Sequence, residues 1–194
     1  GDLPTGGVTD TQSNTYTRQQ QGKGVLGVDG TEMQYGLYTA PITTASGTFT
    51  VTCNPTGTSS EISMWIGEIA GVHATTPVNV SGVAEGTTAS PTIAVTTTVD
   101  DCLVIGLMTE EADNAMAVAA GSTEISEIED NASGQCIAIA RETTAGAAGS
   151  HSVTWSLTGA AGDVWFCAAV AIAPAAGGAA TPIRRSRMLL MGMN

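Results

Sequence analysis

Basic residues are scarce in this sequence. Its 194 residues include six lysines and arginines, of which only Lys23 is a lysine, against 18 acidic residues, and the net charge is −12. Proteins that hold the phosphate backbone of nucleic acids need a basic surface. The charge balance therefore argues against general nucleic-acid binding, and we expect no direct nucleic-acid partner.

Long apolar runs are also missing. No stretch approaches the ~18 consecutive apolar residues that a membrane-spanning helix requires, so we expect no membrane partner. The chain starts at Gly1 instead of a methionine, and no apolar signal-peptide segment follows. Either the chain has been processed or its natural start precedes this sequence.

Cysteine pairs with metal-ligand spacing do not occur. The four cysteines, Cys53, Cys102, Cys136 and Cys167, lie far apart, and each belongs to an apolar segment. Zinc sites usually draw on closely spaced cysteine and histidine pairs, so this pattern argues against zinc. Free buried thiols and one or two disulfides both remain open, and the compartment is therefore undetermined.

Motifs for catalysis are absent or out of context. The sequence has two histidines, His73 and His151, and no Gly-x-Ser-x-Gly segment for a serine nucleophile. Residues 22–27 match the Gly-x-Gly-x-x-Gly spacing of dinucleotide sites, but residues 28–31 do not begin a helix, which that site requires. The many acids offer too many carboxylate pairs to indicate a glycosidase. We expect no enzyme.

Acid-rich segments raise the question of a metal. They comprise residues 100–101, 110–113 and 127–131. Oxygen ligands of this kind suit calcium, but none of the three segments has the spacing of an EF-hand loop. We predict no metal site and no cofactor, and we leave structural calcium as an alternative to solubilising surface acids.

Glycine, threonine and serine are abundant instead. Glycine provides 24 of the 194 residues, and such a composition favours turns and strands over helices. Residues 102–108 and 164–173 are apolar on both faces at strand period, as strands buried between two layers are. We predict that both are central strands.

Other segments alternate apolar and polar residues, with Gly, Pro and Thr at the turns between them. They are residues 16–19, 33–40, 48–53, 62–69, 76–81, 92–96, 135–141 and 152–157. About ten short strands predict one all-β domain over residues 1–173, a jelly-roll-like β-sandwich. We interpret residues 110–121 as a short helix or a loop, and residues 21–30 as a glycine-rich loop.

The end of the chain differs in composition from this domain. Residues 174–182 form an Ala/Gly/Pro linker, and residues 183–194 form an arm that combines arginines with apolar residues. Residues 1–183 hold all 18 acids and three basic residues, a net charge of −15, whereas residues 184–194 hold three arginines and no acid. The arm is thus the electrostatic complement of the body.

We predict that the arm forms a subunit interface. Its arginines would dock on an acidic neighbouring subunit, while its leucines would fill a groove or add a strand. The predicted interface residues are Arg184, Arg185, Arg187, Met188, Leu189 and Leu190. The alternative is a disordered terminus, but that would leave the apolar residues as an exposed patch.

Several segments together resemble a β-sandwich domain of tailed-phage structural proteins and bacterial surface proteins. They are residues 8–16 (VTDTQSNTY), 66–72 (IGEIAGV) with 76–78 (TPV), 90–91 (SP), 101–104 (DCLV) and 165–173 (WFCAAVAIA). The resemblance covers about residues 8–173 and implies a structural or adhesive role without catalytic residues. Two features depart from the family: an apolar strand that usually precedes the Val-Thr-Asp segment is missing, which leaves an empty edge, and the ending is rich in arginine.

Composition, arm and resemblance together lead to one functional prediction. We expect a non-enzymatic component of a phage-like virion, a capsid decoration or tail-associated protein that forms homo-oligomers and contacts other virion proteins. The alternative is a secreted carbohydrate-binding or adhesion module, extracellular or at a cell surface, with a glycan as its ligand.

Overall fold

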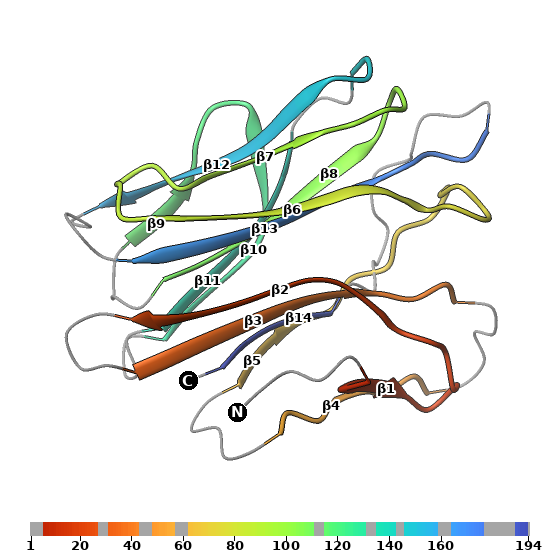
Figure 1. The fold of residues 1–194 in the computed structure, drawn as a ribbon, viewed down its shortest axis with the longest axis horizontal. Coiled ribbons are helices and arrows are strands. Elements are labelled where there is room, and N and C mark those ends of the chain that lie inside the picture. The colour runs from red at the N-terminus through yellow and green to blue at the C-terminus, as the bar shows by residue number, and fades with distance from the viewer. Residues whose placement is uncertain are drawn as a thin grey trace.

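The structure is a computed structural model that describes residues 6–26, 31–42, 48–56, 62–110, 115–130, 135–142, 146–158, 164–176 and 189–193. Within these ranges the chain forms fourteen β-strands and no helix (Figure 1). The protein is therefore all-β and sandwich-like, as the composition and periodicity predicted. None of the described segments is a helix long and apolar enough to cross a membrane.

A five-stranded antiparallel sheet forms the middle layer. Its order is β10 (Ser122–Asp130), β11 (Gln135–Glu142), β8 (Leu103–Glu110), β13 (Trp165–Ile172) and β6 (Val78–Gly86). One face carries a three-stranded sheet of β7 (Thr92–Thr96), β12 (Ser150–Thr158) and β9 (Ala115–Val118). The other face carries a four-stranded sheet of β2 (Thr17–Leu26), β3 (Thr31–Thr39), β14 (Leu189–Met193) and β5 (Ile62–Trp65). Figure 1 shows these three layers stacked, with a small sheet of β1 (Val8–Asp10) and β4 (Val51–Cys53) beside the four-stranded one.

The middle position of β8 and β13 explains why both strands are apolar on both faces. Leu103, Ile105 and Leu107 of β8 pack toward the four-stranded sheet, whereas Val104 and Met108 pack toward the three-stranded sheet. All residues of both strands are buried, and the two strands are hydrogen-bonded neighbours. The prediction of two central strands is confirmed, and the third layer, which the sequence did not predict, supplies the second apolar environment.

A glycine in β8 makes room for the largest side chain of the core. Trp155 of β12 is fully buried and lies against Gly106 at the centre of β8. A Cβ at position 106 would lie 2.8 Å from Cη2 of Trp155 and 3.0 Å from Cβ of Val153. Contacts this short are not tolerated in a close-packed interior. The approach of the three-stranded sheet to the middle sheet therefore depends on a glycine at this position.

Two segments interpreted as irregular are strands. Residues 21–26 continue β2, so the glycine-rich loop predicted for residues 21–30 is wrong there. The first two glycines of the dinucleotide spacing, Gly22 and Gly24, lie inside this strand, whereas a dinucleotide site needs its glycines in a turn that leads into a helix. Gly22 is paired with Tyr35 of β3, and the Tyr35 ring covers it so closely that a Cβ would collide with the ring. Glycine here accommodates a cross-strand ring rather than a phosphate.

The helix-or-loop interpretation of residues 110–121 is wrong for residues 110 and 115–118, which belong to strands, whereas residues 119–121 form a turn, as its loop alternative allowed. β8 extends to Glu110, and β9 begins at Ala115. Acidic residues and alanines indicated a helix start, but Met116 lies in the core and its neighbours Ala115 and Ala117 are exposed. The side chains of β9 alternate between exposed and buried with the period of two that a strand has. Four residues are too few for this alternation to be recognised from the sequence alone.

The N-terminal turn that the sequence predicted is organised by one carboxylate. Asp10, at the end of β1, accepts hydrogen bonds from the backbone N–H groups of Gln12 (2.8 Å) and Asn14 (3.1 Å). It also accepts from the Asn14 side-chain amide and the Tyr16 hydroxyl, each at 2.9 Å. Ser13 has a φ of 59°, which closes the turn. Aspartate at this position therefore fixes how the chain leaves β1 and enters β2.

Replacement of Asp10 by alanine is expected to destabilise the protein by about 1 kcal/mol at neutral pH, because the turn loses its acceptor. Partial burial raises the pKa of Asp10, but the hydrogen bonds from Asn14, Tyr16 and Gln12 outweigh it and hold the pKa below its ordinary value of 3.8. The folded pKa is thus below the unfolded one, so the contribution is complete above pH 3.8 and is lost as the pH falls through the folded pKa. Urea denaturation of both proteins from pH 7 to pH 2.5 should show the difference shrinking; a difference that stays constant would contradict this account.

Candidate functional site

The C-terminal strand occupies the interior of the four-stranded sheet. β14 lies between β3 and β5 and is antiparallel to both. Leu189 is opposite Tyr38, and Leu190 is opposite both Leu37 and Trp65. Figure 1 shows β14, in dark blue near the C-terminus, between the orange β3 and the yellow β5. We call the space between the facing edges of β3 and β5 the C-terminal slot.

β14 is the strand that connects β5 to the rest of the four-stranded sheet. Among the described strands, β5 pairs only with β14, whereas β3 also pairs with β2. The slot-facing strand β3 is buried, with Gln34, Tyr35, Leu37 and Tyr38 at 0 to 3% exposure. Buried backbone N–H and C=O groups must find partners. A chain terminus therefore satisfies the backbone of two strands that are far from it in the sequence.

Two of the predicted interface residues lie in this strand. Leu189 and Leu190 begin β14, while Arg184, Arg185, Arg187 and Met188 lie outside the described residues. The prediction had the arm adding a strand to a neighbouring subunit, and β14 does add a strand, here to the sheet of its own chain. Which copy supplies the strand in an assembly stays a prediction.

The start of the linker is held against the body. Pro174 forms an isolated β-bridge with Val72, and the Ala175 N–H donates to the Gly71 carbonyl oxygen at 2.7 Å. The His73 N–H donates to the Ala173 carbonyl oxygen at 3.0 Å. The chain thus leaves the body beside the segment that follows β5, and residues 177–188 separate this exit from β14.

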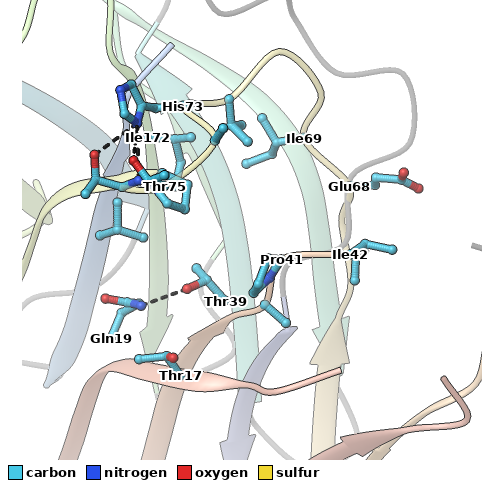
Figure 2. Close-up of a pocket in the computed structure, with 16 residues that line it drawn as sticks. Thr17, Gln19, Thr39, Pro41, Ile42, Glu68, Ile69, His73, Thr75 and Ile172 are labelled. Carbon is cyan, nitrogen blue, oxygen red and sulfur yellow. Dashed lines mark hydrogen bonds between the residues drawn. The ribbon is translucent and has the colours of Figure 1, made fainter. Parts of the chain in front are cut away.

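A cavity of about 640 Å³ lies next to this exit. Its walls come from the first half of β2, the end of β3 and the residues after it, residues 68–78, and the end of β13. We call it the rim pocket. Figure 2 shows Thr17 and Gln19 on one side, Pro41 and Ile42 on another, and His73 and Thr75 at the far side.

The polar groups of the rim pocket are partly bonded to one another. The Gln19 side-chain amide donates to the Thr39 hydroxyl oxygen at 2.7 Å. His73 Nδ1 accepts from the Thr76 backbone N–H at 3.2 Å and contacts the Thr76 hydroxyl at 3.0 Å. A backbone N–H can only donate, so Nδ1 carries no proton in this arrangement. These contacts cap a local turn, and nothing in them orients a histidine as a general base toward a bound substrate.

The second histidine, His151, connects two segments of the structure through its ring nitrogens. His151 Nδ1 lies 2.7 Å from a Glu142 carboxylate oxygen, and Nε2 lies 3.1 Å from the Ala147 carbonyl oxygen. Both ring nitrogens thus face acceptors within a buried site, where the ring is 8% exposed. The contacts tie the end of β11 to the start of β12, and they leave no ring nitrogen to activate the neighbouring Ser152.

The thiols of Cys102 and Cys167 are poorly placed to act as nucleophiles. Cys102 and Cys167 are free and buried. Burial raises the pKa of the Cys167 thiol well above its ordinary value. Burial also raises the pKa of Cys102, and nearby Asp100 and Asp101 add to the effect. Both residues therefore remain thiols, which are far less reactive than thiolates.

The acid-rich loops form structural contacts where they are described. The Asp100 carboxylate accepts from the Ala148 backbone N–H at 2.7 Å, which joins the loop before β8 to the loop before β12. No group of three or more His, Cys, Asp or Glu side chains within the described ranges is arranged to hold a metal ion. Glu127 belongs to β10, an edge strand, where charged side chains discourage pairing with another chain.

Comparisons with protein-family models, with curated proteins and with solved structures find no match to this chain. The likeness to phage and bacterial-surface β-sandwich domains therefore remains a prediction from the sequence.

Sequence analysis identified the arm but not the rim pocket. Four segments far apart in the chain form the pocket, and no single segment has a binding motif. Two features of the sequence mark strand ends at the pocket. Pro41 follows the end of β3, and the turn-forming residues 71–77 lie between β5 and β6. Turn residues mark where strands end, but they do not reveal which ends meet.

Proposed function

We propose that this protein is a non-enzymatic structural component of a phage-like virion, a capsid decoration or tail-associated protein that assembles through its C-terminal arm. The observation that carries the proposal is the position of β14: the end of the chain fills the interior of a sheet, between β3 and β5. Strand addition of this kind uses backbone hydrogen bonds, which any copy of the same segment can supply. A second copy is therefore a chemically equivalent donor.

The charge distribution supports assembly between copies. Residues 1–183 carry a net charge of −15, with 18 acids and three basic residues, and the three remaining arginines are all in the arm. Opposite charges on arm and body favour encounter and fix orientation more than they add affinity. Within the described residues the large buried core and the histidine contacts leave no constellation for catalysis, which fits a structural role.

An adhesion or carbohydrate-binding module is the second candidate. The rim pocket, with hydroxyl and amide groups from Thr17, Gln19 and Thr39, is the feature that favours it. Against it, none of the described lining residues is phenylalanine, tyrosine or tryptophan, whose large rings supply most of the apolar contact area at binding sites. The first proposal is therefore preferred.

Mass and retention measurements separate the two candidates. We expect the full-length protein to form a homo-oligomer of defined mass by size-exclusion chromatography with light scattering, and to pass through polysaccharide columns without delay. Oligomer formation should weaken as salt is raised, because exposed charge pairs are screened. A monomer at all concentrations that is retained on a polysaccharide column would instead support the adhesion module.

A further inference from the structure

β5 forms one margin of the four-stranded sheet. The order of this sheet is β2, β3, β14 and β5, so β14 pairs with one edge of β5, and no described strand pairs with the other edge. The outer edge of such a strand presents backbone N–H and C=O groups that can pair with a further strand. The sheet can therefore be extended along β5.

The other edge strands of the three larger sheets have features that discourage pairing with another chain. β10 carries Glu124 and Glu127 and contains a bulge. β2 carries Arg18 and Lys23 and also contains a bulge, and β6 combines Glu85 with a bulge near its start. β7 and β9 are uncharged, but the side chains that they expose are threonine and alanine, which offer little apolar surface.

β5 has none of these protective features. Residues 62–67 include no charged residue and no proline, and the pairing of β5 with β14 contains no bulge. Met64 and Ile66, the residue after β5, are 36% and 37% exposed, whereas Trp65 between them packs against the core beneath the sheet. An uncharged edge strand with exposed apolar side chains is typical of an association site.

A second copy of this chain fits this edge for two reasons. Each copy has a net charge of −12, so two copies repel each other where acidic edges such as β10 meet, but they can approach along residues 62–67 without facing acids there. The segment is also self-complementary. About a two-fold axis at Met64, residues 62–66 of one copy pair antiparallel with residues 66–62 of the other, and residues from the same side of the strand face each other.

This arrangement brings exposed apolar side chains together. Met64 lies opposite Met64 of the second copy, and Ile66 lies opposite position 62. Side chains directly opposite each other in an antiparallel pair are close enough to pack. The two four-stranded sheets then form one continuous sheet of eight strands.

We propose that the outer edge of β5 is a subunit interface, at which β5 pairs antiparallel with β5 of a second copy about a two-fold axis at Met64. This interface goes beyond the proposed function, because it joins two copies without exchange of the arm. Five residues a side bury less than the ~800 Å² that a standard interface buries on each partner. The contact therefore forms at high protein concentration and adds to other subunit contacts.

Disulfide trapping in the full-length protein tests this interface. Residues directly opposite in an antiparallel pair have Cα atoms about 4.5–5.5 Å apart, within the range that a disulfide spans. Under mild oxidation we expect Met64→Cys to form a 64–64 disulfide between two chains at least ~10-fold faster than Ile66→Cys forms a 66–66 disulfide, because pairing raises the local concentration of the opposed thiols.

Ile66→Cys is a matched control because Ile66 is as exposed as Met64. The proposed register separates the two copies of position 66 by four residues, roughly 13 Å. Peptide mapping by mass spectrometry identifies each bond and distinguishes it from bonds to the native cysteines. Equal rates in the two variants would overturn the proposal.

The same experiment separates this interface from assembly through the arm. Trapping at position 64 should not slow at high salt, because apolar contacts are not screened, whereas contacts of the charged arm should weaken. If the protein forms an oligomer but 64–64 trapping stays at the control rate, the β5 interface is removed and the proposed function is left standing. Fast 64–64 trapping without exchange of the arm supports the β5 interface and contradicts the proposed route of assembly.

A charge variant gives a second readout without cysteines. Met64→Lys places like charges directly opposite each other across the two-fold axis, which is destabilising. At high protein concentration it should lower the weight-average mass measured by sedimentation, while Val83→Lys, at an exposed apolar residue of β6, should not. Both side chains are already more than a third exposed, so each variant should fold, and thermal unfolding checks this. An equal mass for the two variants would contradict the β5 interface.

Discussion

Removal of residues 183–194 is expected to destabilise the protein by on the order of 5 kcal/mol, because β14 holds the four-stranded sheet together. The strand pairs at five positions with β3 and at four with β5. Each net hydrogen bond contributes ~0.5–1.5 kcal/mol, and the buried groups left behind lose their partners as well. Such a loss is comparable to the total stability of many domains, ~5–15 kcal/mol.

A matched pair of variants distinguishes the strand from the charge of the arm. Met191→Pro removes a backbone donor in the middle of β14, where proline is not tolerated, and should reproduce most of the loss. Arg184→Gln/Arg185→Gln leaves β14 intact and should change the free energy of unfolding by less than ~1 kcal/mol. Urea denaturation followed by tryptophan fluorescence measures all three variants. A truncated protein as stable as the full-length chain would show that β14 does not belong to the folded unit.

The second large effect is expected at Gly106. Replacement by alanine should cost about 1–3 kcal/mol, because the new Cβ would lie 2.8 Å from Trp155 and 3.0 Å from Val153 in a fully packed layer. The indole N–H of Trp155 has no hydrogen-bond partner within the described structure. Changes at Trp155 therefore act through packing rather than through a lost hydrogen bond.

A double-mutant cycle tests this packing explanation. Trp155→Phe removes the ring atom nearest to position 106, so Gly106→Ala should cost less in that background, with a coupling of about 1 kcal/mol. Gly82→Ala is the control, since the nearest atom to its Cβ would be Val95 Cγ1 at 3.3 Å, and its cost should be smaller and independent of Trp155. Additive effects of Gly106→Ala and Trp155→Phe would contradict the close packing of the three-stranded sheet against β8 of the middle sheet.

The sequence predicted the middle of the fold better than its edges. Strands β8 and β13 were recognised because burial on both faces leaves an unbroken apolar run. The acidic strand β10 was not recognised, because an edge strand with one covered face carries only Ile125 and Ile128 as apolar markers among its acids. A bulge between Glu124 and Ser126 further breaks its alternation.

The sequence showed which residues form the C-terminal arm, but it did not show which strands the arm pairs with. Composition and charge distinguished residues 183–194 from the body. The pairing of Leu190 with both Leu37 and Trp65 depends on contacts between segments over 100 residues apart, which no local pattern records. The family resemblance indicated an empty edge beside the Val-Thr-Asp segment, but it gave no sign of the interior position between β3 and β5 that β14 occupies.

The most direct test of the account is to mix two full-length variants, one carrying only Met64→Cys and the other only Met191→Cys, and to oxidise them mildly. Positions 64 and 191 are opposite each other in the β5–β14 pair, so a disulfide between them in the mixture joins two different chains. If copies assemble by exchanging their C-terminal arms, the mixture should form this mixed dimer in high yield at concentrations where the unmodified protein is oligomeric. If the mixture yields no more of it than a mixture of Glu85→Cys and Met191→Cys chains, the arm does not join copies of the protein, and assembly through it is contradicted.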